Sequence, residues 1–323
     1  MDASVDISEE YIRNYDPVVL NTLLLDHTTG KNIFWGTSDY EELGKGFEYS
    51  SPITPELITG EYIKVIRPRT LKARELQSAR AREMAEVFTP SWICNAQNNL
   101  IDEAWFGRKN VFNVENDDNT WTTIKDKIEF PEGKTWKDYV RDLRLEITCG
   151  EAPYLTSRYD ATSGDPIAVP HRIGLIDRKL RIVGENAEST GEWLEMAQEA
   201  YKSTYAYEWQ GDSLLLAREA LLFTFIEHYQ ARYGKEPQKK SVQSIANIIS
   251  WNVWQMDGLK CVVPNSCHKE KDNQISLFGG EPTERPCKGC KEDNIKAHNG
   301  VYCIVKDWGA KGKTIRFVDL ITH

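Results

Sequence analysis

Four of the seven cysteines lie close together near the end of the 323-residue chain. Cys287 and Cys290 form a C-x-x-C pair, nineteen residues separate Cys267 from Cys287, and twelve separate Cys290 from Cys303. Tetrahedral zinc needs four nitrogen or sulfur ligands, and a short knuckle joined to a distant second half commonly supplies them. The sequence in between is polar and has little core of its own, so a metal ion would stabilise it strongly. We therefore predict structural zinc bound by Cys267, Cys287, Cys290 and either Cys303 or His298, the alternative being a set of reduced surface thiols.

Carboxylates occur at or near the ends of three predicted strands. Buried strands are predicted at 143–148, 203–209 and 249–255, and they contain or precede Glu146, Glu208 and Asp257. The first strand runs into Cys149-Gly150, a turn in which glycine lets the backbone approach a bound ligand. Because parallel strands end at the same edge of a sheet, the three carboxylates would converge on one nucleotide-like molecule. Each acid taken alone is also compatible with a solvated loop.

Four segments resemble, in sequence and in order, the characteristic elements of the N6-adenine DNA methyltransferases of restriction–modification systems. Glu86–Pro90 (EVFTP) resembles their E/Q-x-F-T-P element, and Glu146–Ala152 (EITCGEA) resembles D-P-A-C-G-S-G. Glu208 with the helix after it is similar to the ribose-binding acid of the family, and Val253–Leu259 (VWQMDGL) is similar to N-x-x-x-x-D-x-L. The resemblance covers roughly residues 80–260.

This resemblance implies a Rossmann-like α/β sheet that binds S-adenosylmethionine (SAM) and acts on DNA. In the family, the glycine turn holds the methionine part of SAM, the second acid binds the ribose, and the third acid pairs with the adenine amine. The positions that match, together with their immediate neighbours, are the expected cofactor-binding residues: Phe88, Thr89, Pro90, Glu146, Cys149, Gly150, Glu208, Trp209, Asp257 and Gly258.

The chain departs from the family pattern in two places. The second glycine of the signature is Ala152, which narrows the pocket. The sequence also contains no Pro-Pro dipeptide, so the Asn/Asp/Ser-Pro-Pro-Tyr/Phe loop, which accepts hydrogen bonds from the N6 amine and stacks on the flipped base, is absent. Asp307 and Trp308, at the end of a predicted strand, would offer a carboxylate and a stacking ring in its place; the alternative is an ordinary strand end.

The elements that must position these groups alternate between strands and helices, which favours a parallel sheet covered by helices. A strongly apolar helix is predicted from about Leu214 to Tyr233, closed by Gly234. The predicted organisation has four parts: an N-terminal extension with a basic helix (1–80), a SAM-binding methyltransferase-like core (81–265), a Cys-rich zinc-ribbon-like insertion (266–300), and C-terminal strands completing the core (301–323).

Composition and charge restrict the class of protein. A hydrophobic content of 40% with 11% aromatic residues is typical of a globular protein, and the net charge of −9 means that DNA would have to bind a local basic surface. Between Lys64 and Arg82, seven basic residues stand against the single acid Glu75, and this segment is either a solvated helix face or an arm that contacts phosphates. No signal peptide and no run of 18 apolar residues is visible, so we expect a cytoplasmic protein without membrane spans.

Three functions are compatible with these features. The first is a SAM-dependent DNA (adenine-N6) methyltransferase with an altered catalytic loop, since methyl transfer requires mainly alignment of the reactants and acceptance of the amine hydrogens. The second is a catalytically inactive SAM- or DNA-binding subunit or anti-restriction regulator, acting with another restriction–modification subunit, and the missing tetrapeptide favours it. The third is a zinc-ribbon nucleic-acid adaptor whose α/β core is vestigial.

Overall fold

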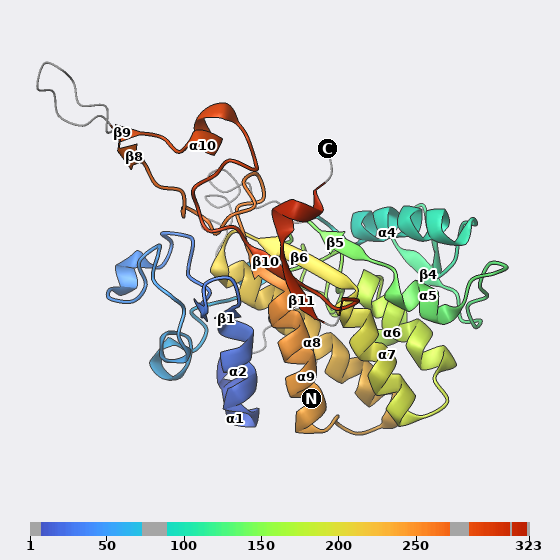
Figure 1. The fold of residues 1–323 in the computed structure, drawn as a ribbon. Coiled ribbons are helices and arrows are strands. Elements are labelled where there is room, and N and C mark those ends of the chain that lie inside the picture. The colour runs from blue at the N-terminus through green and yellow to red at the C-terminus, as the bar shows by residue number, and fades with distance from the viewer. Residues whose placement is uncertain (1–7, 73–88, 272–283, 311, 322–323) are drawn as a thin grey trace, which may run out of the picture.

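The computed structural model describes residues 8–72, 89–271, 284–310 and 312–321, and the chain has a mixed α/β fold (Figure 1). The α-helices of this part are α1 (Glu9–Tyr15), α2 (Pro17–Leu24), α4 (Ser91–Phe106), α5 (Trp136–Arg141), α6 (Leu175–Asn186), α7 (Thr190–Lys202), α8 (Gly211–Tyr233), α9 (Lys239–Asn252) and α10 (Lys288–Glu292). The strands are β1 (Leu25–Asp26), β2 (Lys31–Asn32), β3 (Asn113–Glu115), β4 (Trp121–Thr123), β5 (Arg144–Glu146), β6 (Thr204–Glu208), β7 (Val253–Gln255), β8 (Glu270–Lys271), β9 (Glu284–Arg285), β10 (Ile304–Asp307) and β11 (Lys313–Arg316).

Strands β5, β6 and β7 form a parallel sheet in that order, in which Leu145 pairs with Tyr205 and Ala206 pairs with Val253. Helices α6 and α7 connect β5 to β6, and α8 and α9 connect β6 to β7. Both crossovers run in the same direction, so the usual right-handed connection puts all four helices on one face of the sheet. Figure 1 shows these helices together on one side of the strands. The alternation of strands and helices expected from the sequence is therefore present.

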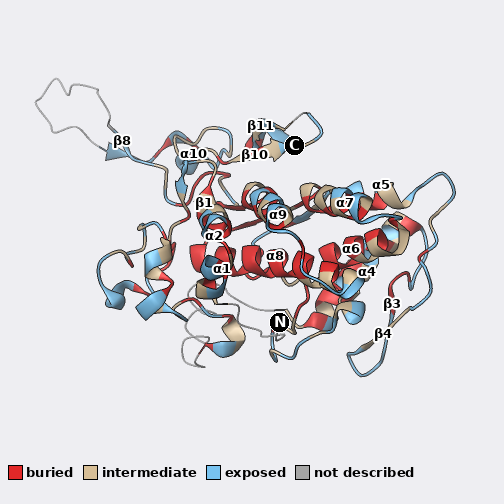
Figure 2. Ribbon diagram, turned by 90° about the horizontal axis from the view of Figure 1, so that it is seen from below, coloured by how far each residue is buried: buried red, intermediate tan, exposed pale blue. Residues whose placement is uncertain are grey.

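Helix α8 is the centre of the helical layer. Its apolar residues occur on all sides rather than in one stripe, as is typical of a helix surrounded by other elements. It is buried over most of its length (Figure 2). Gly234 adopts the left-handed conformation, with φ 66°, just after the last helical residue, which satisfies the terminal carbonyl groups and ends the helix where the sequence predicted.

The opposite face of the sheet is covered by the C-terminal hairpin of β10 and β11 instead of by helices. Tyr207 and Trp254 of the sheet form a small apolar cluster with Cys303, Val305 and Val318 from this region. The hairpin is antiparallel and forms no ladder with the parallel sheet, to which the Tyr205 hydroxyl group links it by donating to the carbonyl of Lys306 at 3.2 Å. The C-terminal strands that were predicted to complete the core therefore pack across the sheet and do not extend it. The last strand, β11, ends at Arg316, and a 3₁₀ helix, η6 (Phe317–Leu320), follows it.

Helices α1 and α2 pack against the helical layer, and Val19 and Leu23 belong to the same buried cluster as Leu214 and Leu215 of α8. Only part of the predicted basic helix falls within the described residues. There, Pro68 precedes a three-residue 3₁₀ helix, η4 (Arg69–Leu71), and the rest of the segment lies outside the described residues.

Candidate functional site

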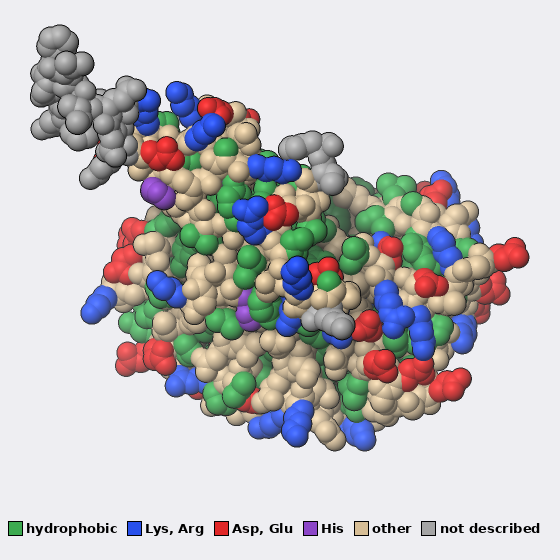
Figure 3. Space-filling view, viewed as in Figure 1, with side chains coloured by type: hydrophobic (Ala, Val, Ile, Leu, Met, Phe, Trp, Pro, Cys, Tyr) green, Lys and Arg blue, Asp and Glu red, His purple; other side chains and the backbone are tan. Residues whose placement is uncertain are grey.

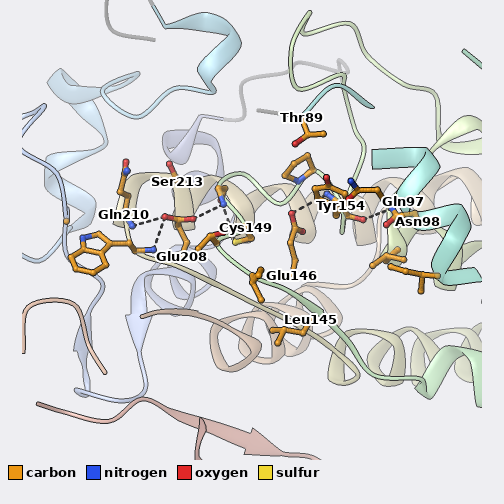
Figure 4. A pocket seen from close by; sticks show the side chains of 18 of the residues that line it. Thr89, Gln97, Asn98, Leu145, Glu146, Cys149, Tyr154, Glu208, Gln210 and Ser213 are labelled. Carbon is orange, nitrogen blue, oxygen red and sulfur yellow. Dashed lines mark hydrogen bonds between the residues drawn. The ribbon is translucent and has the colours of Figure 1, made fainter. Parts of the chain in front are cut away.

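A cavity of about 840 Å³ lies beyond the carboxyl ends of β5 and β6 and extends along β5 toward α4 (Figure 4). Its walls come from the turn after β5, the turn after β6, the start of α8, helix α4 and the segment before it. Six of the predicted cofactor-binding residues line this cavity: Thr89, Glu146, Cys149, Gly150, Glu208 and Trp209. The strand-and-turn pattern in the sequence therefore identified residues that line one cavity, although they lie far apart along the chain.

Glu146, the last residue of β5, reaches the cavity from beneath the loop that follows. Its two carboxyl oxygens accept hydrogen bonds from the backbone N–H groups of Tyr154, at 3.4 Å, and Leu155, at 3.1 Å. Burial raises the pKa of Glu146 to about 8, against the opposing effect of these two N–H donors. At neutral pH the side chain is therefore mostly protonated, and it would ionise readily next to a cationic group.

Glu208, the last residue of β6, ties the two strand-end turns together. One carboxyl oxygen accepts from the N–H of Gly150 at 2.8 Å, and the other accepts from the N–H groups of Trp209 and Gln210 at 2.8 and 3.2 Å. Burial raises the pKa of Glu208, and the same three N–H groups oppose that shift. Gly150 has φ 53°, in the left-handed region that glycine adopts without strain. The carboxylate thus sets the conformation of the glycine turn at the edge of the cavity.

The segment before α4 supplies another wall. Thr89 lines the cavity, Pro90 is the N-cap of α4 and is not among the lining residues, and Phe88 lies outside the described residues. Sequence reasoning missed Asn98 of α4, which is fully buried and also lines the cavity. Its amide nitrogen donates to the carbonyls of Tyr154 and Ile173, both at 3.0 Å, whereas its Oδ1 atom has no hydrogen-bond partner among the described residues.

Asp257 and Gly258 do not line the cavity, so the expected convergence of three acids is wrong for the third. The Asp257 carboxyl group accepts from the N–H groups of Leu259 and Lys260, at 3.1 and 3.2 Å, and forms an ion pair of 3.1 Å with Lys260 Nζ. It therefore stabilises the turn after β7. Gly258 is required there because a Cβ atom would lie 2.6 Å from the ring of Tyr207.

Asp307 and Trp308, the predicted catalytic pair, lie at the opposite end of the sheet from the cavity, and the structure does not bring them to it. The indole N–H of Trp308 donates to Asn252 at 2.8 Å, and Asn252 in turn donates to the backbone carbonyl of Thr204, at the start of β6. The Asp307 carboxylate accepts from the N–H groups of the next turn, at Gly309 and Ala310. This is the ordinary strand end that the sequence left open as the alternative.

A second candidate site lies in the 266–300 segment, where Cys267, Cys287, Cys290 and His298 bring their ligand atoms within 4.8 Å of one another. His298 Nδ1 lies 3.7, 3.6 and 3.6 Å from the three sulfur atoms. Tetrahedral zinc, with bonds of about 2.3 Å to sulfur and about 2.0 Å to nitrogen, places sulfur and nitrogen ligands about 3.6 Å apart. The four side chains therefore have the spacing of a closed Cys₃His site.

The fourth residue of this group is His298, and Cys303 is not part of it. Cys303 is fully buried against the sheet, where its thiol donates to the carbonyl of Gln255 at 3.4 Å. Gly289, inside the knuckle, leaves room for the histidine, because a Cβ atom at this position would lie 2.6 Å from His298 Nδ1. The N–H of Cys290 donates to the sulfur of Cys287 at 3.4 Å, which fixes the knuckle.

Comparison with protein-family models, curated proteins and solved structures finds no match to this chain. Of the helices in the described part of the chain, none has the length and hydropathy needed to cross a membrane. The function must therefore be inferred from the fold and the two candidate sites.

Proposed function

We propose that the chain binds SAM in the cavity beyond β5 and β6 and that it is a DNA methyltransferase-like protein of the N6-adenine type, with a Rossmann-like core. The observation that carries this proposal is the position of the cavity. It is formed at the carboxyl ends of neighbouring parallel strands, and it is lined by the glycine turn and by two strand-end acids. Open α/β sheets bind nucleotide-like ligands at this place.

The cavity suits a ligand with both charged and apolar parts. Its volume of about 840 Å³ falls within the usual range for small-molecule and cofactor sites. Glu146 and Glu208 offer acceptors for an ammonium group or ribose hydroxyls. Asn98 Oδ1 is a buried acceptor that no described residue pairs with, and a ligand donor would satisfy it. Leu145, Ile147 and Ile101 supply an apolar wall for a base or a methylene chain.

The alternative, a SAM-binding subunit without catalysis of its own, is supported by two observations. The sequence has no Pro-Pro dipeptide, and the substitute pair Asp307 and Trp308 lies at the far end of the sheet. The described residues around the cavity thus lack the family's tetrapeptide for a flipped adenine. Catalysis would then require a loop that another subunit provides.

We also propose that Cys267, Cys287, Cys290 and His298 bind structural zinc. Three thiolates and one imidazole are ligands that zinc prefers, and four protein ligands leave no open position for a reacting water. The ion would fix the polar segment around α10 against the body of the protein and would have no part in methyl transfer.

Titration calorimetry with SAM tests the cofactor proposal directly. Glu208→Ala removes an acceptor from the cavity and frees the glycine turn, so we expect SAM affinity to fall by more than about tenfold, since each hydrogen bond to a charged group contributes about 1.5–3 kcal/mol. Asp257→Asn is the matched control, because Asp257 belongs to a strand end of the same sheet but does not line the cavity. No heat of SAM binding to the wild-type chain would refute the proposal.

A transfer assay separates the two forms of the proposal. Tritiated SAM is incubated with the purified chain and a mixture of unmethylated DNA, and incorporation of label into DNA is measured. Label in adenine N6 supports the active enzyme. Binding of SAM without incorporation supports the non-catalytic subunit.

A further inference from the structure

Strand β5 lies at the edge of the parallel sheet, with an open hydrogen-bonding side. It pairs with β6, and no other strand of the described residues pairs with it. Leu143, Leu145 and Ile147 project from this segment and are 71%, 45% and 62% exposed. Figure 3 shows hydrophobic side chains around the hollow between the C-terminal segment and α4, where β5 lies in Figure 1. An exposed apolar edge of this kind favours pairing with another chain.

The direction of the backbone groups indicates which residues would form that pairing. The N–H of Arg144 donates to the carbonyl of Ser203 at 2.9 Å, so Arg144 turns its backbone groups toward β6. Successive residues of a strand turn these groups to opposite sides. The N–H and C=O of Leu145 therefore face the open edge, as do those of its exposed neighbours Leu143 and Ile147.

This edge is complementary to a second copy of itself. In an antiparallel pair with a two-fold axis through Leu145, Leu145 faces the same residue of the other chain, and Leu143 faces Ile147 of the partner subunit. Arg144 then faces the partner's Glu146, which is buried and already accepts hydrogen bonds within its own chain, so this position places no like charges opposite each other. The sequence Leu-Arg-Leu-Glu-Ile thus sets apolar residues opposite apolar residues, with no like charges opposed, in one register.

We propose that the chain forms a symmetric dimer in which the two β5 strands pair antiparallel about Leu145, joining the two parallel sheets into one. Two copies of the exposed apolar row are buried against each other, and the open backbone groups are satisfied. Leu145 and Ile147 also line the cavity, so the second chain would close the side of the cavity that runs along β5. The proposal does not depend on the identity of the ligand.

Sedimentation velocity on the full-length chain tests this proposal. The chain has a mass of 37.1 kDa, and we expect the wild type to sediment with about twice that mass. Leu145→Lys places two ammonium groups opposite each other on the two-fold axis, so we expect the dissociation constant of the dimer to rise by about a hundredfold or more. Leu259→Lys is the matched control, since Leu259 is 89% exposed in the turn after β7, and this variant should remain dimeric.

A crosslinking experiment tests the register separately from the charge effect. Directly opposed residues of a hydrogen-bonded antiparallel pair have Cα atoms about 5.5 Å apart, within the range of a disulfide. Leu145→Cys should therefore form a covalent dimer under mild oxidation, well above the background of the wild type and of Leu259→Cys. A wild-type chain that stays monomeric, or that associates only with a different protein, overturns the proposal, as does Leu145→Lys dimerising like the wild type with an unchanged melting temperature.

Discussion

At the scale of single residues, the protonation of Glu146 links the cavity to the stability of the fold. Its pKa of about 8 in the folded chain lies above the ordinary value of 4.5, because burial disfavours the charged form. Between about pH 4.5 and pH 8, the folded state therefore holds a proton that the unfolded chain has already released. We expect the free energy of unfolding to fall as pH rises through this window, by on the order of 5 kcal/mol in total, and to level off above pH 8.

Chemical denaturation across this pH range checks the expectation. Glu146→Gln keeps the acceptor oxygen and cannot ionise, so its free energy of unfolding should lack this part of the slope. Equal slopes for the variant and the wild type would show that Glu146 is charged in the folded chain throughout.

If Glu146 meets a cationic group of SAM, the affinity of the chain for SAM should depend on pH in the opposite sense to stability. Ionised Glu146 attracts the ligand, so the affinity should increase from pH 6 to pH 8 and then become constant. Calorimetry at several pH values on the wild type and on Glu146→Gln measures this effect. An affinity that does not change with pH would place the cationic group elsewhere in the cavity.

The residues that sequence reasoning identified, and those that it missed, differ in the kind of signal that they carry. Glu146 and Glu208 were found because strand, acid and small-residue turn follow one another along the chain. Asn98 was missed because one amide in the middle of a helix has no distinctive pattern. Asp257 was overinterpreted, since an acid after a strand stabilises a turn through backbone N–H groups as readily as it binds a ligand.

At the scale of elements, the boundary between α9 and β7 shows why part of the site could not be predicted. The apolar run at 249–255 suggests one strand, yet residues up to Asn252 belong to α9 and the strand is only Val253–Gln255. A short apolar run is compatible with a buried helix as well as with a strand. Packing of α9 against α2, α7 and α8 decides for the helix in this chain.

Tertiary packing also determines which residue is the fourth metal ligand. Spacing alone allowed Cys303 or His298, because both follow the C-x-x-C pair at reasonable distances. Cys303 directly precedes β10 and faces the apolar cluster on the sheet, whereas His298 lies in the loop beside the knuckle. Tertiary packing, which spacing does not report, removes Cys303 from the site.

The metal site gives a prediction that discriminates between these two residues. Chain purified from zinc-supplemented cells should carry about one zinc ion, and Cys290→Ser and His298→Ala should each lower this content severalfold or more, because they remove a ligand. Cys303→Ser is the control and should retain the ion. Elemental analysis of the four proteins checks this expectation, and loss of zinc from Cys303→Ser alone would contradict the assignment.

Loss of the ion should act locally. The segment around α10 has few buried apolar residues, so chelation should expose it to proteases while the helical layer stays folded. Limited proteolysis with and without a chelator, followed by mass spectrometry of the fragments, would locate the first cuts. Cuts that begin instead within α8 or α9 would show that the ion supports the whole core.

At the scale of the whole molecule, the parallel sheet resembles one half of a doubly wound arrangement. Its three strands follow one direction from β5 to β7, and their helices cover one face, while a thin hairpin covers the other. The alternation in the sequence was enough to predict parallel strands. The alternation did not reveal that β5 is an edge strand within the described residues. Which strands pair with one another leaves no periodic signal in a single sequence.

A buried arginine, Arg218, connects the N-terminal helices to the sheet. The Arg218 side chain, on α8, donates to the carbonyls of Leu23 and Leu25 at the end of α2. It also donates to the carbonyl of Ser250 in the last turn of α9 and to that of Val253 at the start of β7. Burial lowers the pKa of Arg218 to about 10, so the guanidinium remains charged at neutral pH. Four carbonyls therefore depend on one cation that has no access to solvent.

Replacing this residue should weaken both regions at once. Arg218→Met keeps much of the volume but leaves the four carbonyls without their donor, so we expect a loss of about 3–5 kcal/mol in the free energy of unfolding. Arg316→Met is the control, because Arg316 lies at the surface and pairs with Asp319 three residues away, and it should leave the free energy unchanged within error. Urea denaturation followed by circular dichroism and by tryptophan fluorescence should give coincident transitions for the wild type, because the N-terminal helices and α8 share one core. An Arg218→Met protein as stable as the control would mean that water replaces the guanidinium without cost.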